Sequence, residues 1–145
     1  MYFIDRGKIE KTLVYMEQKI SFLSQLSTRE SQIDQLAFER SAHVIIESIL
    51  DVGNAMIDGF IMRDPGSYED IIDILDDEKV LSKDMIQPLK QVVGARKSLV
   101  HHYIDVNHEA VHQIFKEAND ALEAFPVKVR HYLTNELGPV SAFKN

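Results

Sequence analysis

The sequence predicts an all-α fold, in which four helices form an antiparallel bundle and one additional short helix packs on it. Apolar residues recur at spacings of three and four along most of the 145 residues, the pattern of amphipathic helices. No segment of useful length shows the apolar–polar alternation of a half-buried strand. The polar breaks between periodic segments are short, and short connections favour antiparallel neighbours. We therefore expect residues 1–137 to form a single helical domain and residues 138–145 a flexible tail.

The first two helices follow from their apolar stripes. One helix is expected from Ile9 to Leu26, with a polar turn over residues 27–32 after it. A longer helix is expected from about Ile33 to Ile61. One face of this second helix is polar at helical spacing. Its members are Arg40, His43, Glu47, Asp51, Asn54 and Asp58.

Three more helices are expected in the second half of the chain. The stretch RDPGS breaks the periodic pattern, and Ser67 then caps a short third helix. A fourth helix is expected from about Lys83 toward Val100. Asn107 caps a fifth helix, whose apolar stripe continues past Pro126, where we expect a bend.

Charge and residue usage narrow the class of protein. The net charge is -7, whereas a general binder of nucleic-acid backbones usually carries the opposite sign, so RNA contact is expected only at a small basic patch. The chain has no cysteine, which removes disulfides, thiolate ligands and a cysteine nucleophile. The N-terminus lacks the apolar core of a signal peptide, and no run approaches the roughly 20 apolar residues that span a bilayer. A cytoplasmic protein without membrane contact is expected.

Residues 108–112, HEAVH, match the H-E-x-x-H pattern of zinc proteases. In those enzymes both histidines bind the metal and the glutamate is the general base. At about 100° per residue, His108 and His112 flank the expected inward face, whereas Glu109 points about 160° away from Val111. A catalytic glutamate must share a cleft with its metal, and Glu109 in a first turn is accounted for by the helix dipole. We interpret HEAVH as the start of a packed helix and expect no metal site.

A second motif lies just upstream, where Arg96, His101 and Tyr103 are spaced as R-x4-H-x-Y. Metal-free RNA cleavage needs a base for the 2′-hydroxyl proton, a cation for the charged phosphorane and an acid for the leaving oxygen. His101 can act as base or acid, and the planar fork of Arg96 suits phosphate oxygens. Lys97 and His102 complete the most basic patch of an acidic chain.

The spacing of this motif poses a geometric problem. On one straight helix, Arg96 and Tyr103 share a face, but His101 points about 140° away from Arg96. Either the helix ends near Val100 and the chain turns, or the site is assembled across a dimer.

Three blocks of sequence resemble the HepT-like family of HEPN (higher eukaryotes and prokaryotes nucleotide-binding) domain proteins. They are FERSAHVIIESILDVGNAMI, SYEDIIDIL and LKQVVGARKSLVHHYIDVN, in the family's order. The resemblance covers most of residues 5–135 and is more specific than the R-x4-H-x-Y triplet. It implies a HEPN-like helical bundle that forms a homodimer, with its site in a cleft at or near the interface. It also implies a metal-independent endoribonuclease toxin in which Arg96 and His101 are catalytic.

The resemblance further implies a protein partner, a minimal nucleotidyltransferase antitoxin. That enzyme neutralises the toxin by transferring AMP to the motif tyrosine, here Tyr103, and the adduct adds negative charge beside Arg96. ATP is needed only as the AMP donor of the partner, so no cofactor is expected. Many members have asparagine or another polar residue directly after the arginine, whereas this chain has Lys97, whose ammonium group can contact phosphate.

The polar face of the second helix is expected to support this site. Glu47 and Asp51 fall in a resembling block and are expected to orient Arg96 or His101 from the neighbouring helix. The remaining side chains with charge on this face are expected at the surface or at an interface. They are Arg40, His43 and Asp58.

A hypothesis from a different class is a non-catalytic nucleotide-binding or scaffold partner of a nucleotidyltransferase. In that case the bundle presents nucleotide or Tyr103 to the enzyme. This hypothesis predicts partner binding without RNA cleavage by the purified protein.

Overall fold

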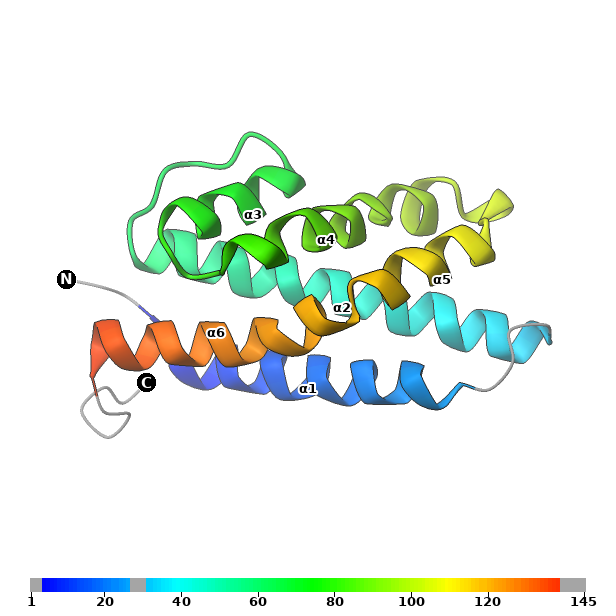
Figure 1. Ribbon diagram of the computed structural model, residues 1–145, viewed down its shortest axis with the longest axis horizontal. Coiled ribbons are helices and arrows are strands. Elements are labelled where there is room, and N and C mark those ends of the chain that lie inside the picture. The colour runs from blue at the N-terminus through cyan, green and yellow to red at the C-terminus, as the bar shows by residue number, and fades with distance from the viewer. Residues whose placement is uncertain (1–3, 27–30, 139–145) are drawn as a thin grey trace.

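The computed structural model describes residues 4–26 and 31–138, and these ranges hold helices and no strand (Figure 1). The α-helices are α1 (Arg6–Gln25), α2 (Gln32–Gly59), α3 (Tyr68–Asp77), α4 (Lys83–Gly94), α5 (His108–Glu117) and α6 (Asn119–Leu137). Two short segments between α4 and α5 are the π-helical η1 (Lys97–His101) and the 3₁₀-helical η2 (Tyr103–Asp105). Most of the turn predicted at 27–32, and residues 139–145 of the predicted tail, lie outside the described residues.

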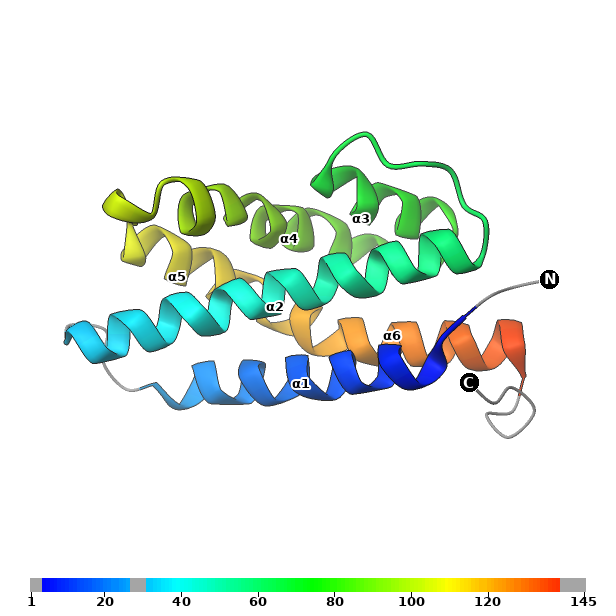
Figure 2. The same ribbon diagram turned by 180° about the vertical axis from the view of Figure 1, so that it is seen from behind.

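The helices run alternately up and down along one long axis. α1 and α2 are antiparallel, and α4 returns beside α2. The chain then runs back along the bundle, with α5 beside α4 and α6 beside α1 and α4 (Figures 1 and 2). The short α3 packs on the outside against α2 and α4. The prediction of an antiparallel four-helix bundle with an additional short helix is therefore confirmed. α5 and α6 together form the fourth helix of this bundle.

The predicted apolar stripes meet in one continuous core. Leu13 and Met16 of α1 are fully buried, as are Phe125 and Val129 of α6 on the facing side. Burying such side chains contributes on the order of 1.5–3 kcal/mol each before the entropy cost of ordering them. No helix in the described part of the chain is long and apolar enough to cross a membrane.

The helix starts lie where their capping residues predict them. The Ser67 hydroxyl accepts a hydrogen bond from the Asp70 backbone N–H at 3.1 Å, and the Asn107 side chain accepts one from the Ala110 N–H at 3.0 Å. Each cap satisfies a backbone donor that the first turn of a helix leaves without a partner. Local sequence thus determines where α3 and α5 begin.

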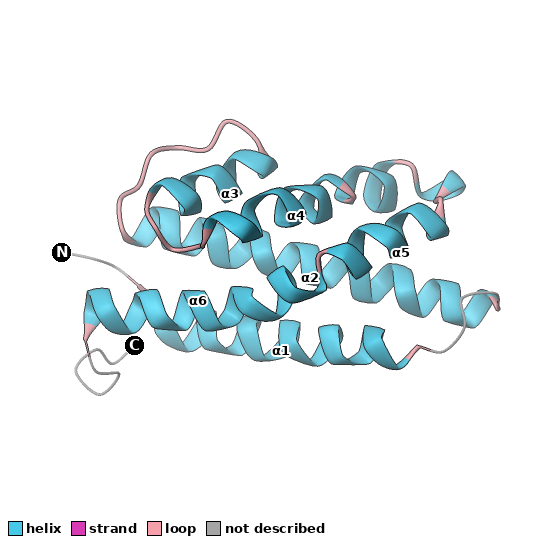
Figure 3. Cartoon of the chain, in the orientation of Figure 1, coloured by secondary structure: helices cyan, strands magenta, loops and turns pink. Residues whose placement is uncertain are grey.

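The helix ends depart from the predictions. The predicted single helix after Asn107 is interrupted at Ala118, where α5 ends and α6 begins, and Pro126, where a bend was expected, lies buried inside α6 (Figure 3). The predicted fourth helix ends as an α-helix at Gly94, and the chain continues to His101 through the π-helical segment η1. Apolar periodicity alone reveals neither change.

The two terminal helices are joined by ion pairs. Arg130 of α6 donates to both carboxylate oxygens of Glu10 at 2.8 and 3.0 Å, and to both oxygens of Glu17 at 2.7 and 2.9 Å. These hydrogen bonds raise the pKa of Arg130 and lower the pKa of Glu17. The contacts fix the register of α1 against α6 on the side of the bundle away from α3 (Figure 1).

Candidate active site

Arg96 lies directly after α4 and is held by two residues from other helices. Its Nε donates a hydrogen bond of 2.7 Å to Oε1 of Glu47 on α2. Its guanidinium carbon lies 4.8 Å from the ring centroid of Tyr68 on α3, a cation–π contact. The hydrogen bond to Glu47 raises the pKa of Arg96 above its ordinary value. The side chain is 20% exposed, so a permanent cation sits at the surface in a fixed orientation.

The two Nη groups of Arg96 remain available to bind a ligand. Within residues 4–26 and 31–138, no acceptor other than Glu47 takes a hydrogen bond from Arg96. The same Glu47 oxygen lies 3.3 Å from Nε2 of His43, one turn earlier on α2. Glu47 is thus anchored from both sides, while the two Nη groups of Arg96 can meet a phosphate in the bidentate manner that arginine favours.

The π-helical segment η1 changes the direction in which His101 points. The His102 backbone N–H donates to the Lys97 carbonyl at 3.1 Å, a bond between residues five apart. Five residues therefore make about one turn here, whereas on an α-helix they end about 140° round the axis. The buried Leu99 fixes this turn on the core. A turn of the chain therefore lies between Arg96 and His101, and assembly of the site across a dimer stays a prediction.

The remaining predicted site residues lie on the open surface around this turn. Lys97, His101 and Tyr103 are all exposed, and Tyr103 is 67% exposed. No hydrogen bond or ion pair among the described residues joins Arg96 to His101 or to Tyr103. Asp51 is exposed one turn beyond Glu47 and forms no ion pair in the same part of the chain. Glu47 contacts Arg96, as the sequence predicts, whereas Asp51 does not.

Two members of this cluster were not identified from the sequence. His43 was placed at the surface or an interface, yet it contacts the carboxylate that holds Arg96. Its position four residues before Glu47, on one helical face, was a usable signal. Tyr68 falls in the predicted short third helix, and no site role was predicted for it. No local signal connects it to Arg96, because their contact depends on how α3 packs beside α4.

The HEAVH segment has a different role. His108 Nε2 contacts Glu39 Oε2 on α2, and the His112 ring stacks on Phe38 with centroids 3.6 Å apart and planes at 14°. Glu109 is exposed. Across the described ranges, no three histidine, cysteine, aspartate or glutamate side chains cluster in a way that could hold a metal ion. The segment packs the start of α5 onto α2, and its two histidines are engaged with protein groups.

A cavity of about 570 Å³ lies between α1, α2 and the α5–α6 junction, with Leu23, Phe38 and His112 in its wall. Neither Arg96 nor Glu47 lines it. The candidate active site therefore lies apart from this cavity. A second hollow, of about 430 Å³, is lined by Gly94, Ala95 and Ser98 at the α4–η1 junction, and neither Arg96 nor Glu47 lines it.

Comparison with known proteins agrees with this picture of the fold. The chain is 49% identical over 144 residues to "Putative RNase YutE" of Bacillus subtilis (strain 168), covering 99% of this chain and 100% of that protein. The solved structure of YutE, described as a cytosolic protein of unknown function, superposes with a TM-score of 0.95 over 99% of this chain and 100% of that one.

More distant solved structures share the fold. A toxin–antitoxin complex with AMP-PNP matches with a TM-score of 0.76 at 17% identity, over 85% of this chain and 97% of that chain. A tri-AMPylated HEPN toxin of Shewanella oneidensis in complex with its MNT antitoxin matches with a TM-score of 0.75 at 18% identity, over 85% and 96% of the two chains. At such identities the likeness concerns the fold alone.

The description of the matching family model is ribonuclease HepT-like, and the match extends from residue 9 to residue 129. That span contains the whole cluster around Arg96 together with His101 and Tyr103. Because the match covers most of the chain and the YutE identity extends along nearly all of it, the protein belongs to the ribonuclease HepT-like family.

Proposed function

We propose that this protein is a metal-independent endoribonuclease and acts as the toxin of a toxin–antitoxin pair. The contacts of Arg96 are the main support for this proposal. Its Nε is hydrogen-bonded to Glu47 and its guanidinium lies against the Tyr68 ring, while its Nη groups form no hydrogen bond among the described residues. His101 follows at the end of the π-helical segment η1 and is exposed. Family membership and the name of the YutE relative support the choice of RNA as substrate.

The proposed reaction needs a cation and two proton-transfer groups, and it needs no metal ion. Arg96 binds the non-bridging oxygens of the scissile phosphate and stabilises the charge of the phosphorane. The 2′-oxygen forms a bond to phosphorus as its proton leaves to a base, and the bond to the 5′-oxygen breaks as that oxygen gains a proton from an acid. His101 is proposed as one of these two proton-transfer groups. The products would be a 2′,3′-cyclic phosphate and a free 5′-hydroxyl.

The decisive experiment is incubation of purified protein with RNA in EDTA. Wild type should cleave, and both Arg96→Gln and His101→Ala should lose activity by about 100-fold or more, the usual scale for an electrostatic or proton-transfer group. His131→Ala is the matched control, because His131 is an exposed histidine on α6 and does not belong to the cluster around Arg96. DNA of the same sequence should not be cut, since it lacks the 2′-hydroxyl.

Two results would overturn the proposal. One is full cleavage by His101→Ala with wild-type folding. The other is the absence of cleavage by wild type on total cellular RNA, combined with binding of a nucleotidyltransferase, which would favour the scaffold hypothesis.

We also propose that a minimal nucleotidyltransferase transfers AMP to Tyr103. Its phenol is 67% exposed on η2, two residues after His101, so an enzyme can reach it. A relative in fold is described as an AMPylated HEPN toxin with its MNT antitoxin. Incubation with such an enzyme and ATP should join the Tyr103 oxygen to the α-phosphate of ATP and release pyrophosphate. The mass should rise by that of AMP less one water in wild type and in Tyr15→Phe, which changes another exposed tyrosine. Tyr103→Phe should gain nothing; modification of this variant would contradict the assignment.

A homodimer is proposed as the active form. It would place a second copy of the exposed surface near the first and complete the cleft that the family resemblance implies. Sedimentation of the purified protein should give twice the 16.6 kDa mass of one chain. A monomer that cleaves RNA at full rate would contradict this part of the proposal.

A further inference from the structure

Tyr68 is the least expected member of the Arg96 cluster. It is the first residue of α3 and is 48% exposed. Its ring lies 4.8 Å from the guanidinium carbon of Arg96, which comes from the junction of α4 and η1. Tyr68 is not part of the buried core, and the contact recorded for its ring is the one with this cation.

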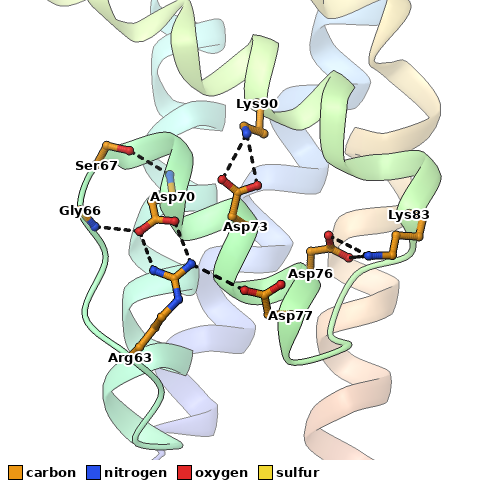
Figure 4. Close-up of polar contacts among 9 residues, drawn as sticks. All are labelled: Arg63, Gly66, Ser67, Asp70, Asp73, Asp76, Asp77, Lys83 and Lys90. Carbon is orange, nitrogen blue, oxygen red and sulfur yellow. Dashed lines mark hydrogen bonds and ion pairs between the residues drawn. The ribbon is translucent and has the colours of Figure 1, made fainter.

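The start of α3 is built firmly enough to hold this ring in place. Arg63 forms a two-pronged pair with Asp70 at 2.8 and 2.9 Å, and the Gly66 N–H donates to the same carboxylate at 2.9 Å (Figure 4). Ser67 caps the Asp70 N–H at 3.1 Å. The loop before α3 and the first turn of α3 are thus tied together on both sides of Tyr68.

A second set of contacts fixes α3 against α4, the helix that leads into Arg96. Lys90 of α4 donates to both oxygens of Asp73 at 3.1 and 3.2 Å (Figure 4). Lys83, at the start of α4, pairs with Asp76 at 3.1 Å. Tyr68 and Arg96 therefore belong to two helices that cannot slide past each other without breaking these pairs.

We propose that Tyr68 is a positioning residue for Arg96, an inference that rests on the proposed nuclease function. Glu47 fixes the Nε edge of the guanidinium, and His43 in turn contacts Glu47. The guanidinium carbon of Arg96 lies 4.8 Å from the centroid of the Tyr68 ring. Glu47 and Tyr68 thus contact Arg96 from two different helices, and together they restrict where its guanidinium lies. Such preorganisation matters because a misplaced group stabilises the transition state poorly.

The kinetic test compares three variants with wild type. Tyr68→Leu removes the ring and should lower kcat about tenfold, the scale of a cation–π contact, with KM changed by about twofold or less. Tyr68→Phe keeps the ring and should restore most of the lost kcat. Tyr15→Leu is the matched control, because Tyr15 is 42% exposed and Lys19 lies 4.8 Å from its ring centroid, on α1. It removes the same kind of contact and should leave kcat unchanged.

A second test does not depend on catalysis. In the NMR spectrum of labelled wild type, the side-chain signals of Arg96 should be displaced by the ring current of Tyr68. In Tyr68→Leu this displacement should vanish and rotation of the guanidinium about the Cζ–Nε bond should become faster. Unchanged Arg96 signals would overturn the proposal, whether or not the protein cleaves RNA.

The kinetic outcomes are also decisive. Equal kcat for wild type and Tyr68→Leu, or a rise in KM alone, would overturn the positioning role, the second result because it indicates direct RNA contact by Tyr68. If wild type fails to cleave any RNA, the nuclease function fails, while the NMR test still decides whether Tyr68 holds Arg96. Thermal melting of each variant confirms that the fold is intact.

Discussion

At the scale of single residues, the end of α2 contains a strained position. Ile61 has a positive φ of 57° and is 76% exposed. The Met62 N–H donates to the Ile57 carbonyl at 2.9 Å, so Ile61 occupies the left-handed position of a Schellman motif, where glycine is usual. Left-handed backbone costs a residue with a Cβ roughly 1–2 kcal/mol, and most for a β-branched side chain.

Ile61→Gly should therefore raise the free energy of unfolding by about 1 kcal/mol, since relief of strain outweighs the added freedom of the unfolded chain. Urea denaturation measures the change. Lys79 occupies the equivalent position after α3 with φ 63°, and Lys79→Gly should stabilise less because lysine is unbranched. A less stable Ile61→Gly protein would show that the isoleucine side chain contributes more than its backbone costs.

A second prediction at this scale concerns Asp70 and pH. The hydrogen bonds from Arg63, then that from Gly66, lower the pKa of Asp70 from 3.8 to about 2. The carboxylate form is favoured by folding, so the stabilising effect is complete above about pH 4 and is lost as pH falls toward 2. Asp70→Asn should melt at a lower temperature than wild type at pH 7, and the difference should shrink between pH 4 and pH 2. A difference that is constant with pH would contradict the assignment.

At the scale of helices, the contact between α2 and α3 depends on a missing side chain. A Cβ added to Gly53 would lie 2.5 Å from Cγ2 of Ile71, and Ile71 is buried and stiff at χ1. Glycine inside a helix costs about 1 kcal/mol relative to alanine. The close approach of α3 explains why it is present here.

Gly53→Ala should lower the free energy of unfolding by about 1–2 kcal/mol, because overpacking exceeds the gain in helix propensity. Gly94→Ala is the control within the same chain, since nothing lies within 4 Å of its added Cβ. That change should stabilise by up to about 1 kcal/mol. Equal effects of the two substitutions in chemical denaturation would contradict this account of the α2–α3 contact.

At the scale of the whole molecule, the net charge of -7 opposes binding of RNA. Under the proposed function, the affinity for RNA must then come from the few cations around Arg96 and Lys97. With about two phosphate contacts to a single strand, log K should fall against log salt with a slope of about -1.4. Binding of 2′-O-methyl RNA, which cannot be cleaved, measures this slope. A slope of about -4 or steeper, corresponding to about six phosphate contacts, would indicate a much wider basic surface than this chain displays.

The sequence predicted the fold because helices are specified by residues that lie close together in the chain. Apolar periodicity gave the helices and their buried faces, and Ser67 and Asn107 gave two of their starts. The ends were harder. A glycine at position 61 would have signalled the end of α2. Because the chain has isoleucine there, the predicted helix extended two residues beyond Gly59. Ala118 carries no signal of a break, and Pro126, which does carry one, lies within a helix that continues past it.

The same distinction applies to the candidate site. The sequence by itself determined the motif residues Arg96, His101 and Tyr103, and suggested Glu47 by its place on a polar helical face. Only the tertiary structure decided what those groups touch. It set Glu47 and Tyr68 around Arg96 and supplied the π-helical turn before His101. The physical reason is range: a helix is specified by neighbours three and four residues apart, whereas the orientation of one guanidinium depends on three helices packed together.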